Sequence, residues 1–403
     1  MESILASTED HLVSNLAFKL PQNSASYVTD KQQATYFPQG GDVYSPLNGQ
    51  RVIRFALSSS GYLDLSSLVF TMDFQNGPLG ACTTLVDGGH CLFTRVRVLI
   101  SGTEVENLEF HNVVAEMFHR LLPQEKQNNV SLMAFGGGPI AAGVKKQIIF
   151  RPSILGICNQ PLWIPPFMGH QGCVIEMHLA NPEIFMQSGE GQSQIYSLSN
   201  VRALCDVYTL DAALNNTYAS HVLAGKPLVF ALKSLVTTSF QLQPGTPSFD
   251  VNVARSISRV NSIFVTLHGQ PGALVQDVNT FISGGDPEEI QGRVQIGSKQ
   301  WPDGQPVTGL SAFWYRLVTG LGVFHSASHT LAITRAQYAA SHFIWCTDTE
   351  KVPIATGSGY AVNKGELITV SMKNLAATHQ RALVTIHHDI IMELRDTGCD
   401  VLV

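Results

Sequence analysis

The chain has 403 residues, which is too long for one ordinary hydrophobic core and fits two domains of roughly 200 residues each. Only 14% of the residues are charged and the net charge is −6, so the sequence lacks the basic patches that bulk nucleic-acid binding needs. No apolar stretch approaches the roughly 20 residues of a membrane-spanning helix.

The first residues, MESILASTEDHLVSNLAFK, carry acidic side chains where a secretion signal would have a basic start and a continuous apolar run. We therefore expect synthesis and folding in the cytosol. The seven cysteines show no Cys-x-x-Cys spacing and are predicted to be buried free thiols, with disulfides or metal sites as the alternative.

The first half is predicted to begin with an arm that lacks a pattern and to continue with strands and one helix. Residues 1–33 lack a sustained pattern and are expected to form an N-terminal arm. Turns then lead into the strand RVIRFAL at 51–57. The stretch 95–122 begins as a strand and becomes an amphipathic helix. Its apolar face recurs at helical spacing at Phe110, Val113, Val114, Met117, Phe118 and Leu121.

The second half is predicted to contain the same elements in the same order. The first domain is expected over 34–211, a linker over 212–228 and the second domain over 229–403. The predicted helix returns 200 positions later with every spacing kept, at Leu310, Phe313, Trp314, Leu317, Val318 and Leu321. Short β-rich runs between 34 glycines and 19 prolines favour an all-β sandwich or barrel for both domains.

Four further pairs of segments support an internal duplication. SLVFTM at 67–72 matches SIFVTL at 262–267, and the strand with Val96 and Val98 matches RVQIGSKQ with Val294 and Ile296. GCVIEMHL at 172–179 resembles GELITVSM at 365–372. VRALCDVYTLD at 201–211 resembles QRALVTIHHDIIMEL at 380–394, and each of these is expected to be the last strand of its half.

No residue pattern predicts catalysis or metal binding. His325 and His329 in HSASH have the spacing of two ligands on a helix but lack the glutamate of a zinc-protease motif, so a structural role is favoured over a metal site. His387 and His388 in HHD are expected to face opposite sides of a strand. The loop GGGPIAAGVKK at 136–146 lacks the Lys-Ser or Lys-Thr of a phosphate loop. We assign no catalytic, cofactor or metal residue.

Several ordered segments carry a resemblance to a known family. They are SLSNVRALCDVYTLDAALNNTY at 197–218, SRVNSIFVTL at 258–267, GRVQIGSKQWP at 292–302, and HFIWCTDTEKVP and GELITVSMKNL at 342–353 and 365–375. Together they resemble the double jelly-roll major capsid proteins of icosahedral double-stranded DNA viruses. The nearest group is that of the Polinton-like viruses and virophages, and the nucleocytoplasmic large DNA viruses are more distant.

The resemblance implies two tandem eight-stranded jelly-roll β-sandwiches, each with an inserted α-helix. It implies a structural protein without enzymatic activity or cofactor, which self-assembles into pseudo-hexagonal homotrimeric capsomers that tile an icosahedral shell. The implied partners are neighbouring capsomers, minor and penton capsid proteins, and an inner membrane, without sequence-specific contact to nucleic acid. The implied location is the virion capsid, after synthesis in the host cytoplasm or assembly in the nucleus or a viral factory.

Two other classes remain as alternatives. A lectin-like tandem β-sandwich would need clustered exposed aromatics or acidic calcium loops, for which GGDPEE at 284–289 is the one weak candidate. A bicupin-type enzyme would need a His-x-His, a Glu and a later His, which HSASH and HHD do not supply. Because the helix recurs once per domain, we interpret its twelve apolar residues as packing residues that seat each helix on its own sandwich.

Overall fold

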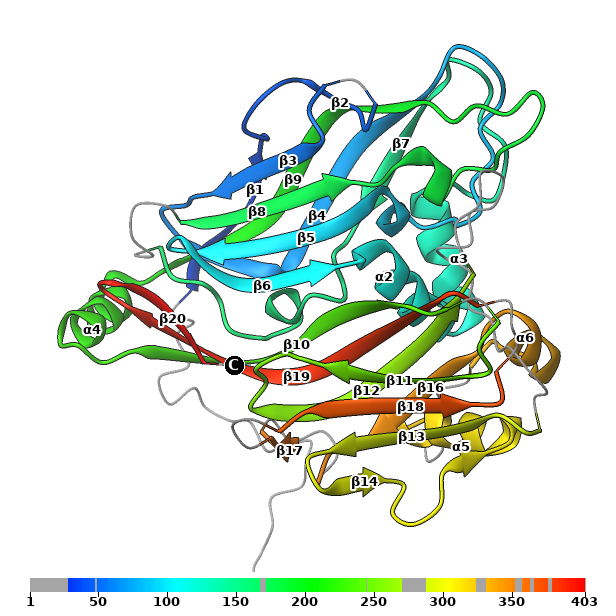
Figure 1. Ribbon diagram of the computed structural model, residues 1–403. Coiled ribbons are helices and arrows are strands. Elements are labelled where there is room, and N and C mark those ends of the chain that lie inside the picture. The colour runs from blue at the N-terminus through cyan, green and yellow to red at the C-terminus, as the bar shows by residue number, and fades with distance from the viewer. Residues whose placement is uncertain are drawn as a thin grey trace, which may run out of the picture.

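The computed structural model describes residues 28–402 apart from position 48 and the segments 167–171, 244, 270–287, 324–330, 352–356, 363–365 and 376–378. Its strands form four sheets, which are arranged as two β-sandwiches (Figure 1). Within the described residues no helix is both long and apolar enough to cross a membrane.

The N-terminal sandwich consists of two antiparallel sheets. One has the order β1 (Val28–Tyr36), β9 (Tyr196–Leu210), β4 (Tyr62–Asn76) and β7 (Lys145–Phe150), with β2 (Val43–Tyr44) paired to β9. The other has the order β3 (Val52–Leu57), β8 (Cys173–Leu179), β5 (Phe93–Ile100) and β6 (Thr103–Glu109).

The C-terminal sandwich repeats this arrangement. One sheet has the order β10 (Leu228–Gln241), β19 (Arg381–Arg395), β12 (Arg259–His268) and β16 (Ile344–Asp348), extended by β17 (Tyr360–Ala361) and β20 (Gly398–Leu402). The other has the order β11 (Ser248–Val253), β18 (Ile368–Lys373), β13 (Gln291–Ile296) and β14 (Lys299–Trp301), with β15 (Val307–Thr308) paired to β13.

The two sandwiches share one strand order when β2, β15, β17 and β20 are set aside. In each half the first strand pairs with the eighth, the eighth with the third and the third with the sixth. The second strand pairs with the seventh, the seventh with the fourth and the fourth with the fifth. The predicted pair of eight-stranded sandwiches is therefore confirmed.

The helices lie in corresponding places in the two halves. Between β6 and β7 the chain forms α2 (His111–Arg120) and α3 (Gln124–Met133), and between β15 and β16 it forms α5 (Leu310–Gly320) and α6 (Arg335–Ala340). Each sandwich thus has two inserted helices, where the sequence pattern predicts one. The second helix escapes the pattern because α3 buries none of its residues and α6 is a short helix that buries only Tyr338. Short 3-10 turns lie at η1 (Gly89–Leu92), η2 (Gly156–Cys158) and η3 (Pro182–Ile184).

The strands differ from the sequence-based expectation in three places. β1 begins at Val28, inside the range 1–33 assigned to the arm, because it is an edge strand whose mostly exposed side chains give no apolar alternation. β6 separates the strand with Val96 and Val98 from α2, so the two are not directly consecutive. β19 is not the last strand, because the chain turns back into β20, which pairs with its end.

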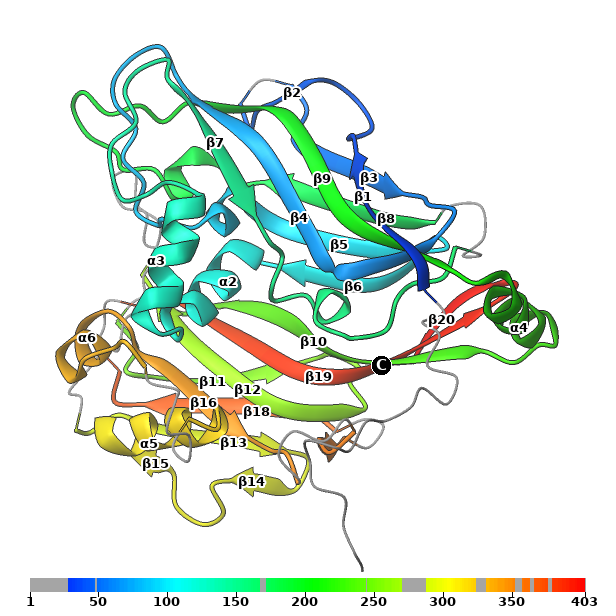
Figure 2. The ribbon, with the colours of Figure 1, turned by 180° about the vertical axis from the view of Figure 1, so that it is seen from behind.

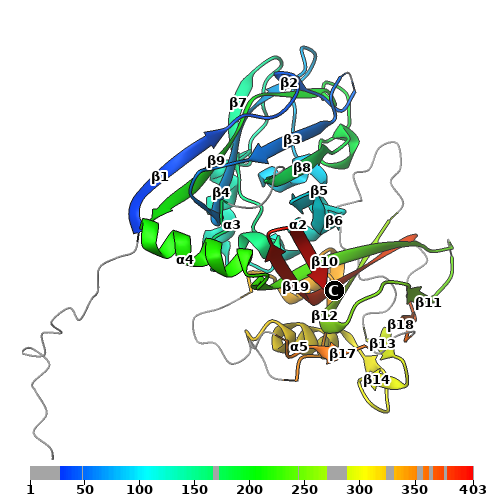
Figure 3. The same ribbon diagram turned by 90° about the vertical axis from the view of Figure 1, so that its left-hand side faces the viewer.

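The segment between the sandwiches is largely helical. α4 (Ala212–Leu223) occupies most of the range 212–228, and its N-terminus is capped by the Asp211 side chain, which accepts a hydrogen bond from the Ala213 amide at 3.1 Å. Val222 is its one buried residue, so the helix is a connector and not a core element. Figure 3 shows α4 at the side of the molecule, running from the end of β9 toward β10.

The burial of the central strands shows how the sandwiches are joined. The third strand of the N-terminal half, β4, alternates between buried and half-buried residues, whereas its counterpart β12 is buried along nearly its whole length. Because the side chains of β12 are buried on both faces of its sheet, a second layer must cover the outer face of that sheet as well. The outer face of the β10-β19-β12-β16 sheet is covered by the N-terminal sandwich, and Figure 2 shows α2 lying between the two halves.

Candidate functional site

The junction between the two sandwiches contains a buried carboxylate. Glu106 of β6 accepts hydrogen bonds from the backbone amides of Gly156 at 2.9 Å and Ile157 at 2.8 Å, both in η2. It also accepts one from the hydroxyl of Ser234 in β10 at 2.5 Å. Burial raises the pKa of Glu106, while the hydrogen bonds from Ser234, Ile157 and Gly156 oppose that rise. One side chain therefore joins two segments of the N-terminal sandwich to the edge strand of the other.

The backbone approach beside Glu106 requires a glycine. A Cβ atom placed on Gly156 would collide with the carbonyl oxygen of Lys233 in β10. Only a residue without a side chain lets η2 come this close to the edge of the C-terminal sheet. Gly156 is therefore part of the junction, although its φ angle is not in the left-handed region.

Helix α2 contributes aromatic and cationic contacts to the same junction. The ring of Phe118 packs against that of Phe264 in β12 with centroids 5.2 Å apart and an interplanar angle of 73°. The guanidinium of Arg381 in β19 lies over the ring of Phe110, 4.7 Å from its centroid. Arg120 donates a hydrogen bond to the carbonyl of Ser341 at 3.3 Å. α2 therefore packs on both sandwiches at once.

A buried charge network fixes the inner side of α2. The Glu116 carboxylate lies 3.0 Å from His90 Nε2 in η1 and 2.6 Å from Nε of Arg120, one turn along the helix. Burial alone would disfavour the charged form, but the His90 hydrogen bond and the Arg120 charge outweigh it and lower the pKa of Glu116 to about 2. The carboxylate is thus ionised at neutral pH and fully partnered, as a structural ion pair requires.

The twelve apolar helix residues singled out in the sequence all lie at least half-buried. Seven are buried, namely Val113, Val114, Met117, Leu121, Leu310, Phe313 and Leu317. Five are half-buried, namely Phe110, Phe118, Trp314, Val318 and Leu321. Phe110 and Phe118 contact the C-terminal sandwich in addition to their own half. A pure packing role for the whole set stays a prediction.

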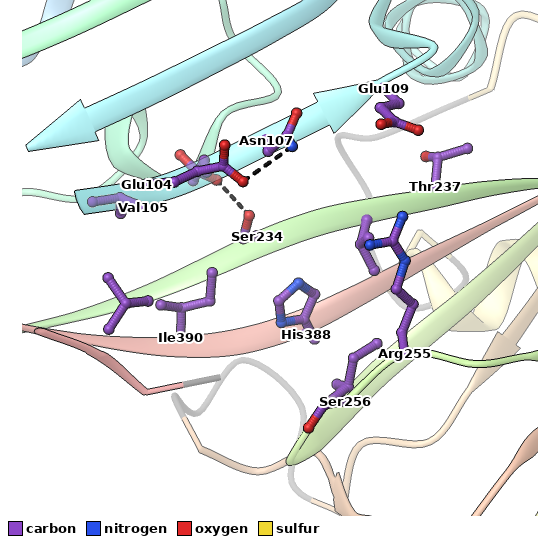
Figure 4. A pocket seen from close by; sticks show the side chains of 14 residues that line it. Glu104, Val105, Asn107, Glu109, Ser234, Thr237, Arg255, Ser256, His388 and Ile390 are labelled. Carbon is purple, nitrogen blue, oxygen red and sulfur yellow. Dashed lines mark hydrogen bonds between the residues drawn. The ribbon is translucent and has the colours of Figure 1, made fainter. Parts of the chain in front are cut away.

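A small hollow of ≈ 200 Å³ lies beside Glu106 and is shown in Figure 4. Glu104 of β6 lies on one side of it, and Ser234 and His388, which stand opposite each other on β10 and β19, come from the sheet on the other side. Glu104 is held by Arg97 at 2.6 Å and by the Asn107 amide at 3.0 Å. Glu104 and Glu106 thus make structural contacts, and burial lowers the pKa of His388, which keeps that ring neutral near pH 7. The arrangement resembles a packed junction and not a general acid–base pair.

The polar candidates from the sequence are not brought together. His387 lines a large cleft and His388 the small hollow, which places them on opposite sides of β19 as the strand period predicts. Over the described ranges no group of three or more His, Cys, Asp or Glu residues could hold a metal ion. HSASH at 325–329 lies outside those ranges, and all seven cysteines are buried and free.

Comparison with known proteins gives matches at the level of structure only. No family model and no curated relative matches the chain. The crystal structure of PBCV-1 VP54, fitted into a reconstruction of the virophage Sputnik, matches with a TM-score of 0.67 and 11% identity, over 94% of this chain and 98% of that one. The Faustovirus major capsid protein matches with a TM-score of 0.65 and 9% identity, over 96% and 93%. The Sputnik virophage structure matches with a TM-score of 0.58 and 11% identity, over 98% and 93%.

The chain folds as a double jelly roll. All five repeated segments fall on equivalent elements of the two jelly rolls. The paired strands are β4 and β12, β5 and β13, β8 and β18, and β9 and β19, and the paired helices are α2 and α5. The faint sequence repeat therefore marks the same positions of one fold used twice.

The residues that join the two jelly rolls were not found from the sequence. Glu106, Gly156 and Ser234 look like ordinary polar or turn positions, because Glu106 stands among Glu104, Asn107 and Glu109 in one short strand. Phe118 was found only as a member of a helix face. No signal in one sequence tells which polar residue becomes buried against a segment more than a hundred positions away.

Proposed function

We propose that the chain is a major capsid protein, a structural and non-catalytic building block that assembles as a homotrimer and tiles an icosahedral viral shell. The observation that carries this proposal is the same jelly roll formed twice in one chain, matched along nearly its whole length by VP54 and the Faustovirus major capsid protein. Three copies of a chain with two equivalent sandwiches present six similar units around one axis. Such a ring closes through head-to-tail contacts between copies.

An exposed apolar ribbon supports contact between copies. Val229 in β10, Ile391 in β19 and Leu402 in β20 lie on one face of a three-stranded extension of the sheet. Ile391 is 43% and Leu402 56% exposed, and Leu223 at the end of α4 is 75% exposed. Clustered apolar side chains of this kind mark interaction surfaces. We assign this ribbon to the contact between neighbouring subunits.

The proposal extends to the partners of the trimer and to its location in the assembled particle. The trimer would contact neighbouring capsomers, minor and penton capsid proteins, and on its inner side an inner membrane or further capsid proteins. The chain would reside in the virion capsid after synthesis in the host cytoplasm, with assembly there, in the nucleus or in a viral factory. The net charge of −6 argues against bulk electrostatic binding of nucleic acid by the chain, and we propose no sequence-specific contact to it.

The decisive measurement is the molar mass of the purified protein by light scattering, combined with electron microscopy. A trimer of 43.8 kDa chains has a mass of about 131 kDa and should appear as a hexagon-like particle. A protein that stays monomeric across the accessible concentration range would contradict the proposed function.

A pair of variants tests the assigned contact. Ile391→Asp combined with Leu402→Asp places charges in the apolar ribbon and should shift the trimer toward monomer. Leu132→Asp is the matched control, because Leu132 is 77% exposed on α3, far from the ribbon in the fold. If both proteins remain equally trimeric, the ribbon is not the subunit contact, although the trimer itself would stand.

A further inference from the structure

A large cleft lies between the two jelly rolls, separate from the hollow beside Glu106. Its volume is ≈ 870 Å³, within the range of clefts that hold small ligands. α2, α3 and the end of β7 form one wall, and β10, β12 and β19 form the other. The capsid function proposed above assigns no role to this space.

The deep part of the cleft is apolar. Phe150 and Phe264 are 4% exposed and Leu235 is 8% exposed, and Phe118 and Leu321 complete this surface. These side chains come from both jelly rolls, so the apolar surface exists only because the two are joined. A ligand that buries an aliphatic or aromatic body here gains the hydrophobic contribution of the area removed from water.

The charged side chains of the cleft are all cationic. No Asp or Glu is among its described lining residues, although the chain has 31 acidic and 25 basic residues. Lys233 is neutralised by Glu350 at 2.6 Å. Lys126 on α3 and Arg151 after β7 are exposed, so they lie on the solvent side of the cleft, and no carboxylate of the described chain pairs with either. Arg151 donates one hydrogen bond to the carbonyl of Ser66 at 3.0 Å and keeps its charge unpaired. The opening therefore offers two cations to an anion.

Two histidines of the wall, His111 and His387, add polarity without charge. His111 is fully buried, and burial lowers its pKa to about 3, so its ring is neutral at pH 7. Its Nδ1 lies 3.3 Å from the carbonyl of Phe93, whereas Nε2 has no hydrogen-bond partner within the described residues. Burial likewise lowers the pKa of His387, together with the positive charge of Lys233, to about 4. Neither ring therefore adds to the positive charge that Lys126 and Arg151 bring to the cleft.

We propose that this cleft binds an anionic amphiphile of the fatty-acid class, with the aliphatic chain on the apolar surface between the jelly rolls and the acid group at Lys126 and Arg151. A neutral amphiphile would gain the same burial but not the ion pairs. A small polar anion would gain the ion pairs but leave the apolar surface exposed. The apolar surface and the two cations together therefore favour a ligand that has both an aliphatic chain and an acid group.

The test is a fluorescence titration of the full-length protein with cis-parinaric acid, followed by displacement with dodecanoate or with uncharged dodecanol. Dodecanoate should displace the probe at about tenfold lower concentration than dodecanol, the effect of two exposed ion pairs. Val130→Trp should abolish binding, because Val130 lines the cleft from α3, a helix without buried residues that accommodates a larger side chain.

A charge-matched pair of variants separates the cleft from general attraction. Lys126→Gln with Arg151→Gln should weaken dodecanoate binding about tenfold, whereas Lys145→Gln with Arg202→Gln, exposed cations outside the cleft, should leave it unchanged. Equal behaviour of the two double variants, or unchanged binding in Val130→Trp, would overturn the proposal. If Val130→Trp dissociated the trimer while wild type bound no probe, the cleft would belong to a subunit contact instead. The mass of the wild-type protein tests the capsid function independently.

Discussion

At the scale of single residues, Glu106 is where removal of one side chain should weaken the junction most clearly. Its carboxylate is the acceptor for two amides and one hydroxyl, all buried. Glu106→Ala leaves these donors without a partner and should lower the free energy of unfolding by about 2–4 kcal/mol, measured by urea denaturation. Glu104→Ala is the control, because its pair with Arg97 is part-exposed and should contribute about 1 kcal/mol or less. Equal losses of unfolding free energy in the two variants would show that Glu106 stabilises the protein no more than a part-exposed ion pair does.

His387 makes stability depend on pH. Burial, and secondarily the charge of Lys233, lower its pKa from 6.5 to about 4 in the folded state. Between these values the unfolded chain binds the proton and the folded chain does not, so stability is full above pH 6.5 and falls as the pH drops toward 4. His387→Gln should reduce the slope of unfolding free energy against pH in this window by up to about 1.4 kcal/mol per pH unit.

The matched control for that measurement is His221→Gln. His221 is exposed on α4, so its surroundings change little on unfolding. Urea denaturation of both variants and of the wild type at several pH values between 7 and 4 gives the slopes directly. An unchanged slope in the His387 variant would mean that this ring is solvated in the folded protein.

At the scale of elements, α2 differs from its counterpart α5 because it connects the two jelly rolls. The Phe118 and Phe264 rings meet across the junction. A double-mutant cycle with Phe118→Ala and Phe264→Ala should show a coupling of about 0.5–1.5 kcal/mol in urea denaturation. The control cycle pairs Phe118→Ala with Tyr338→Ala, since Tyr338 packs against Trp314 within the C-terminal jelly roll. A coupling of the same size in both cycles would mean that it reflects general destabilisation.

The elements that the sequence predicted are those whose apolar residues face a buried surface. β4, β12, α2 and α5 have such patterns, and the duplication follows from them. β1 has none, because backbone pairing with β9 holds it while most of its side chains are exposed. The junction could not be predicted for a different reason. Glu106 and Ser234 are 128 positions apart, and neither residue differs locally from a solvated one.

At the scale of the whole molecule, the fold predicts that the two jelly rolls act as one rigid block. They are joined by α4, which is mostly exposed, and by the separate buried contacts of Glu106, Gly156 and Phe118. The proposed role as a shell subunit needs the second kind of connection, because a single exposed helix would leave the angle between the sandwiches free. The buried contacts should therefore hold the two jelly rolls together even when the chain is cut in α4.

This can be tested by inserting a protease site into α4 after Asn216 and cleaving the folded protein. The two fragments should remain together in size-exclusion chromatography under native conditions and separate only in denaturant, because the junction buries side chains from both halves. The same cleavage in a Phe118→Ala background should lower the denaturant concentration at which they separate. Fragments that part on cleavage of the otherwise wild-type chain would show that α4, and not the buried junction, holds the jelly rolls together.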